Sequence, residues 1–85
     1  MNIERKLVDA LERNDLIKIE KLFNDIYNSN YKLVYFCVAN LVKNKEHILE
    51  LVDDVFINFY NHVHIINIDG SIKYYLTRSA RNLSI

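Results

Sequence analysis

The sequence predicts an all-α protein, a small bundle of four to five helices. Proline is absent from the 85 residues and glycine occurs once, so few turns of the chain can be tight, as the turns between short strands of a sheet must be. Apolar residues make up 51% of the sequence and recur at spacings of three and four, the period of an amphipathic helix. These observations argue against β-sandwiches, barrels and glycine-rich phosphate loops, and they favour one helical domain.

The first half of the chain shows three apolar stripes at helical spacing. Residues 3–13 carry the first stripe, and Asp15 is a suitable N-cap for the second, which covers residues 16–27. Residues 28–30 read Asn-Ser-Asn, whose side chains compete for backbone hydrogen bonds, so they predict a break before a third stripe over residues 31–42.

The second half shows two more stripes, over residues 48–63 and 72–83. Residues 64–70 are the least periodic part of the chain and hold its one glycine, which predicts a loop. No stop signal follows the last stripe, so that helix is expected to run on to Ile85. The side chains suited to cap these two helices are Asn44 for the first, and Ser71 or Asp69 for the second.

Several residues that could carry chemistry are better explained as structural. The three histidines, His47, His62 and His64, lack a cluster of cysteines or carboxylates at ligand spacing, so they are expected at the surface and no metal or cofactor is predicted. Cys37 is the single cysteine, so no intramolecular disulfide can form. It is expected to be a buried thiol, and a reducing compartment suits the chain. Most of the following aromatic residues are expected in the core: Tyr31, Tyr35, Phe36, Phe56, Phe59 and Tyr60.

The zero net charge hides an acidic helix followed by a basic one. Residues 45–62 hold one lysine against four carboxylates, a net charge of −3, and residues 63–85 hold one aspartate against three cations, a net charge of +2. On the acidic helix, like charges recur opposite the apolar stripe, which costs an isolated helix a few tenths of a kcal/mol per pair. That stripe is either a solvated face or a docking surface for a basic partner: Glu46, Glu50, Asp53, Asp54 and Ile57.

The last helix carries cations beside an aromatic ring, on the side away from its apolar stripe. Single-stranded nucleic acid is bound by such surfaces, because phosphates meet the cations and bases stack on the ring. The alternative is a solvated face whose arginines favour a helix C-terminus. The residues on this side are Lys73, Tyr74, Thr77, Arg78, Arg81 and Asn82.

Two runs of residues carry a family resemblance. Residues 50–57 read Glu-Leu-Val-Asp-Asp-Val-Phe-Ile, which resembles the Asp-Leu-Val-Gln-Glu-Val-Phe-Leu stretch of bacterial sigma factors. Residues 72–82 resemble that family's Phe-x-x-Trp-Leu-x-x-Ile-Ala-Arg-Asn stretch, with identical residues at Leu76 and at the last three positions. Upstream, the segment from Phe23 to Tyr35 resembles its opening helix pair. From about residue 15 to residue 85 the chain resembles region 2 of sigma-70-type factors, closest to the extracytoplasmic-function group or the small toxin-gene regulators.

The chain also departs from the family pattern. Asp53 stands where the family has Gln, Tyr75 where it has Trp, and Ser79 where it has Ile. Residues 48–49 read Ile-Leu in place of Ala-Glu. Residues 1–14 are predicted to form an N-terminal helical extension, and residues 15–85 to form the domain itself. Because no stop signal follows the last helix, the domain is expected to be truncated at its C-terminus.

The resemblance implies a mechanism in two parts. The acidic helix would dock on the clamp helices of the RNA polymerase β′ subunit, through Glu50, Asp53, Asp54, Ile57 and Asn58. The last helix would contact the non-template strand of promoter DNA at the −10 element, through Lys73, Tyr74, Arg78, Arg81 and Asn82. An anti-sigma factor is a further candidate partner, and an apolar seam left at the chain's end would favour self-association.

This mechanism predicts a bacterial, cytoplasmic transcription initiation factor that is not an enzyme. No run of residues approaches the roughly 20 apolar residues of a membrane span, so no membrane partner is expected. One rival is a protein-interaction module, such as an anti-sigma-like protein or phage adaptor, whose acidic helix binds another basic helix. A second rival is a small helical enzyme or metal-binding bundle.

Overall fold

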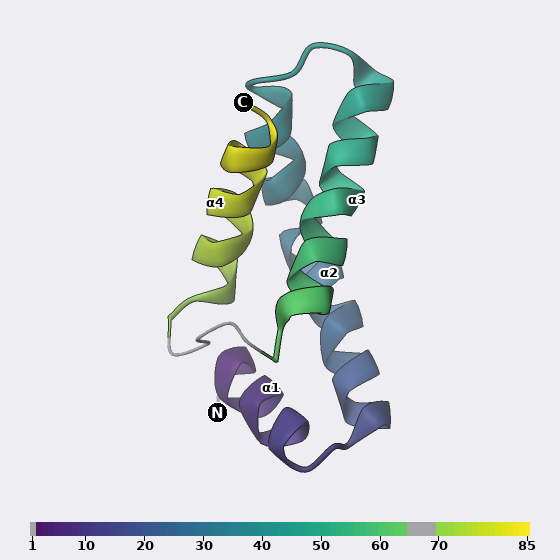
Figure 1. Cartoon of the computed structure of the whole chain (residues 1–85), viewed down its shortest axis with the longest axis vertical. Helices are drawn as coiled ribbons and strands as arrows, with labels where there is room; N and C mark the ends of the chain where they lie inside the picture. Colours follow the sequence, from purple (N-terminus) through teal and green to yellow (C-terminus); the bar gives the residue numbers. More distant parts are fainter. Residues whose placement is uncertain (1, 65–69) are drawn as a thin grey trace.

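The computed structural model describes residues 2–64 and 70–85, which form four helices and no strand (Figure 1). This architecture confirms the all-α class. The helices are α1 (Ile3–Glu12), α2 (Leu16–Ala39), α3 (Lys45–His62) and α4 (Ile72–Leu83).

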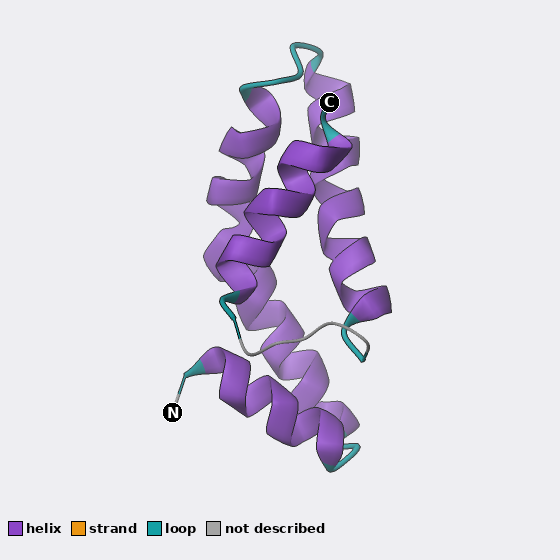
Figure 2. Ribbon diagram, turned by 60° about the vertical axis from the view of Figure 1, so that its left-hand side comes forward, coloured by secondary structure: helices purple, strands orange, loops and turns teal. Residues whose placement is uncertain are grey.

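The three longer helices lie side by side, and α1 crosses one end of them. Helices α2 and α3 run antiparallel, and α4 runs in the direction of α2 and contacts both (Figures 1 and 2). The turn between α1 and α2 contains the domain boundary predicted between residues 14 and 15, and that division stays a prediction. Within the described ranges, no helix is long and apolar enough to cross a membrane.

One apolar core joins all four helices. Phe56 and Phe59 of α3 are each 1% exposed and are the largest of its fully buried side chains. Leu7 of α1 and Leu76 of α4 are completely buried, so both outer helices are anchored by apolar contacts. The buried positions follow the predicted stripes, which is why the helices form where the sequence predicts them.

Polar side chains cap the helix N-termini. Asp15 and Asn44 accept hydrogen bonds from the backbone N–H groups of Lys18 and His47, each at 3.2 Å, as predicted. Of the two residues suggested as the cap of α4, Ser71 fills the role and Asp69 lies outside the described residues. Most of the loop predicted over 64–70 also lies outside them.

The break predicted at residues 28–30 is wrong, because α2 continues through them. Asn30 is buried, and its side-chain nitrogen donates to the carbonyl oxygen of Ile26 at 2.8 Å, one turn earlier. The Asn30 side chain therefore bonds back to the preceding turn without interrupting the helical backbone. The five predicted stripes therefore form four helices.

Three further expectations need correction. Phe36 is 64% exposed, because it faces away from α3 and α4 on the outer side of α2. Cys37 is half-buried rather than buried. Helix α4 ends at Leu83 rather than running to Ile85, and the Ser84 hydroxyl donates to the carbonyl oxygen of Ala80 at 2.7 Å.

Candidate functional site

The acidic side chains of α3 lie on the exposed side of that helix. Glu50, Asp53 and Asp54 are exposed, and Ile57 among them is 51% exposed. Glu46 is exposed as well, so the whole predicted stripe lies at the surface, four carboxylates with an aliphatic side chain beside them.

Aromatic contacts hold α3 against α2 and so fix the direction of the acidic side. Tyr60 stacks on Phe23 of α2, with ring centroids 4.4 Å apart, and its hydroxyl donates to the Phe23 carbonyl oxygen at 3.1 Å. Burial, followed by the nearby Tyr27, raises the pKa of the Tyr60 phenol to about 12. Phe56 meets the Tyr27 ring at 4.8 Å. These rings prevent α3 from rotating about its axis.

The two adjacent aspartates point to different sides of the acidic surface. Burial raises the pKa of the Tyr27 phenol, and the charges of Tyr31 and Asp53 raise it further. Asp53 lies one turn before Phe56, whose ring contacts Tyr27, and is therefore on the side of α3 next to α2. Asp54 is turned about 100° from it, as successive helical residues are, so the pair does not converge on one ligand.

On α4 the predicted cations and aromatic ring are exposed together. Lys73, Arg78 and Arg81 are exposed, and Tyr74 is 65% exposed. The Thr77 hydroxyl donates to the carbonyl oxygen of Tyr74 at 3.0 Å, so its polar group is already used within the helix. Cations beside an exposed ring can bind phosphates and stack against a base.

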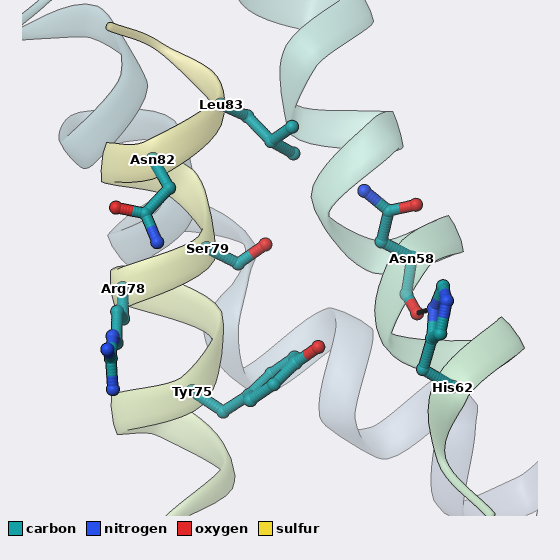
Figure 3. Close-up of a pocket in the computed structure, with 7 residues that line it drawn as sticks. All are labelled: Asn58, His62, Tyr75, Arg78, Ser79, Asn82 and Leu83. Carbon is teal, nitrogen blue, oxygen red and sulfur yellow. Dashed lines mark hydrogen bonds between the residues drawn. The ribbon is translucent and has the colours of Figure 1, made fainter. Parts of the chain in front are cut away.

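A groove of about 450 Å³ lies between parts of α3 and α4. In Figure 3, Tyr75, Ser79 and Leu83 point from α4 toward α3. His62 and Asn58 face them from α3, and a ring nitrogen of His62 lies 2.8 Å from the Asn58 carbonyl oxygen. The groove is lined by Asn58, His62, Tyr75, Arg78, Ser79, Asn82 and Leu83.

The structure brings together residues that the sequence assigned to two different surfaces. Asn58, predicted to face polymerase, lines the groove with Arg78 and Asn82, which were predicted to face DNA. Lys73 and Arg81 are exposed but are not part of the groove lining.

Sequence reasoning also missed part of the lining. Tyr75, Ser79 and Leu83 were assigned to the apolar stripe, although they lie at its edge toward α3. Their spacing of four predicts that they share one side of the last helix. It does not predict which neighbouring helix that side faces.

The charges on these two helices are not neutralised within the described residues. The sole ion pair there joins Arg13 to Asp9 of α1, with 3.3 Å between the guanidinium nitrogen and the carboxylate oxygen. Among the same residues, no three His, Cys, Asp or Glu side chains gather where they could hold a metal ion.

Most of the chain matches a known protein family. The model of the Sigma-70 region 2 family matches residues 26–85, which include the C-terminal part of α2 and all of α3 and α4. Comparison with curated proteins and with solved structures gives no significant match. Because the match covers well over half of the chain and contains both charged helices, the chain belongs to the sigma-70 region 2 family.

Proposed function

We propose that this domain links RNA polymerase to promoter DNA through two separate surfaces, the acidic side of α3 and the basic side of α4. Family membership itself gives the chain a sigma-factor role in transcription initiation and implies interaction with RNA polymerase and promoter DNA. The family domain is not enzymatic, and the proposal leaves all chemistry to polymerase. It places the protein in the bacterial cytoplasm, where transcription occurs.

The polymerase-facing surface consists of Glu50, Asp53, Asp54 and Ile57 on α3, with Asn58 at its edge. Three exposed carboxylates would steer docking onto the basic clamp helices of the β′ subunit. The half-exposed Ile57 would supply apolar contact beside the charges, at the C-terminal end of the stripe.

The DNA-facing surface lies on α4. Lys73, Arg78 and Arg81 would bind phosphates of the non-template strand at the −10 element, and Tyr74 would stack on a base. Asn82 lies in the groove beside Arg78, where its amide can both donate and accept hydrogen bonds to a base edge.

The observation that carries the proposal is the separation of unneutralised charge. Acidic and basic side chains lie on different helices, and none of them forms an ion pair with another described residue. A charge of one sign along each helix suits a partner of the opposite charge, a basic protein surface for α3 and a nucleic acid for α4.

The docking half is tested by titrating residues 1–85 with a purified fragment of the polymerase clamp helices at two salt concentrations. We expect micromolar binding that weakens with salt. The double variant D53K/D54K should lose that binding by a factor of 100 or more, roughly the effect of reversing two contact charges. Circular dichroism should show that it remains folded, because both side chains are exposed.

The matched control is E20K/D25K, which makes the same change in net charge at exposed positions of α2. Its binding should stay within a few-fold of that of the unaltered chain. Equal affinity of D53K/D54K and the unaltered chain would contradict docking through α3. Clamp binding without any DNA contact would favour the alternative, a protein-interaction module of anti-sigma or adaptor type.

A further inference from the structure

The first helix contacts the helix that carries the DNA-facing residues. A carboxylate oxygen of Glu4 in α1 accepts a hydrogen bond from the backbone N–H of Ile72, the first residue of α4, at 3.0 Å. The two residues are 68 positions apart. Figures 1 and 2 show the start of α1 near the start of α4.

This bond satisfies a donor that the helix itself cannot. The first N–H groups of any helix lack a partner within it, and a negative charge there is favoured by the helix dipole. Ser71 accepts the N–H of Tyr74 at 3.2 Å, whereas the N–H of Ile72 is satisfied from a different helix. The contact is partly buried and involves a charged acceptor, which makes it stronger than an exposed neutral one.

Glu4 is itself held in place. Asn2 caps α1 by accepting the N–H of Arg5 at 2.9 Å, and the buried Leu7 and Ala10 fix α1 in the core. The side chain of Ile72 is 3% exposed. The first turn of α4 is thus held by apolar contacts on its inner side and by a carboxylate at its end.

We propose that Glu4 is a positioning residue for the DNA-facing side chains of the first turn of α4, Lys73 and Tyr74. This inference rests on the function proposed above. It makes α1, which lies outside the residues that match the family, a working part of the DNA-facing surface. Without the carboxylate, the first turn of α4 would fray and its lysine and tyrosine would lose their fixed direction.

The sign of the expected effect separates positioning from simple electrostatics. E4A removes a negative charge, so by charge alone it should strengthen binding to a polyanion. If Glu4 positions the first turn, E4A should instead weaken binding. E4Q removes the same charge but keeps an oxygen that can accept the Ile72 N–H. E12A removes an equal charge from the exposed last residue of α1.

The experiment uses the whole 85-residue chain and follows its backbone amides by nuclear magnetic resonance. The probe is a single-stranded DNA of about 10 nucleotides at low ionic strength. In E4A we expect the Ile72 amide to exchange with solvent about tenfold faster, the effect of losing about 1.4 kcal/mol locally. The DNA affinity of E4A should fall several-fold, while its affinity for the clamp fragment stays unchanged.

The two matched variants should behave differently from E4A. E4Q and E12A should bind DNA at least as well as the unaltered chain, and their Ile72 amides should exchange at its rate within a factor of about three. Equal or stronger DNA binding by E4A would overturn the positioning role alone. Failure of the unaltered chain to bind DNA would overturn the DNA-facing half of the proposed function, and this inference with it.

Discussion

Tyr60 combines an apolar contact and a polar contact at one position. Its ring stacks on Phe23, and its hydroxyl donates to the backbone carbonyl of the same residue. Partial burial disfavours the phenolate, which is why the pKa rises to about 12 from the usual 10.0. Neither the stack nor the hydrogen bond survives if the phenol must ionise and turn toward water.

Tyr60 should make the stability of the domain depend on pH in the alkaline range. The folded protein keeps the phenol protonated up to about pH 12, whereas the unfolded chain releases the proton near pH 10. The contribution of Tyr60 to stability is therefore complete below pH 10 and is lost as the pH rises toward 12. Urea unfolding over this range should show a decreasing free energy of unfolding.

The variant Y60F should flatten that decrease, and Tyr27, whose pKa is also raised, should account for part of what remains. Y74F is the control, since Tyr74 is 65% exposed and should leave the slope unchanged. An identical slope in Y60F and the unaltered chain would show that the Tyr60 phenol is not protected.

Asn30 should limit the stability of the bundle. It is 8% exposed, and its side-chain oxygen has no hydrogen-bond partner among the described residues. N30L removes this unpaired acceptor and adds apolar burial, so the free energy of unfolding should rise by about 1–2 kcal/mol. N28L, at an exposed position two residues earlier, changes helix propensity alone and should give at most about 0.5 kcal/mol. A loss of stability in N30L would indicate that the oxygen has a partner, such as a buried water.

At the scale of the helix, position decides what a serine does. Ser71 precedes α4 and caps it, whereas Ser29 lies inside α2 at an exposed position. The same side chain competes with the backbone in both places. A serine hydroxyl stabilises the helix where a backbone N–H group lacks a partner, and it destabilises the helix where every N–H group is already bonded.

Replacing each serine by alanine should therefore have opposite effects. S71A should lower the free energy of unfolding by about 1 kcal/mol, because the Tyr74 N–H loses its acceptor. S29A should raise it by about 0.5 kcal/mol through higher helix propensity. Thermal unfolding of the two variants beside the unaltered chain measures both. A destabilised S29A would show that α2 needs the serine hydroxyl.

At the scale of the whole molecule, the bundle fixes the two proposed surfaces relative to each other, and they meet at the groove that Asn58 lines with Arg78 and Asn82. Helices α3 and α4 pack against each other and against α2, so neither can rotate without disrupting the shared core. The acidic side of α3 and the basic side of α4 are consequently presented in fixed relative positions. A bridging factor that must contact polymerase and DNA at the same time benefits from this rigidity.

Independence of the two surfaces can be tested with R78A/R81A. Loss of two cations should weaken binding to single-stranded DNA and lower the slope of log affinity against log salt by about 1.4, at about 0.7 per phosphate contact. Affinity for the clamp fragment should not change. K18A/K21A removes two exposed lysines of α2 and is the control for net charge. Loss of clamp binding in R78A/R81A would mean that the surfaces overlap.

The sequence by itself determined the all-α class, the helix caps at Asp15 and Asn44, and the acidic and basic helices, because periodicity and capping act over three or four residues. The tertiary structure alone decided that α2 continues through Asn30, that Asn58 faces the groove beside α4, and that Phe36 stays outside the core. It also brought Glu4 to Ile72 across 68 positions. These outcomes depend on which side of a helix meets which neighbour, and no local pattern specifies that choice.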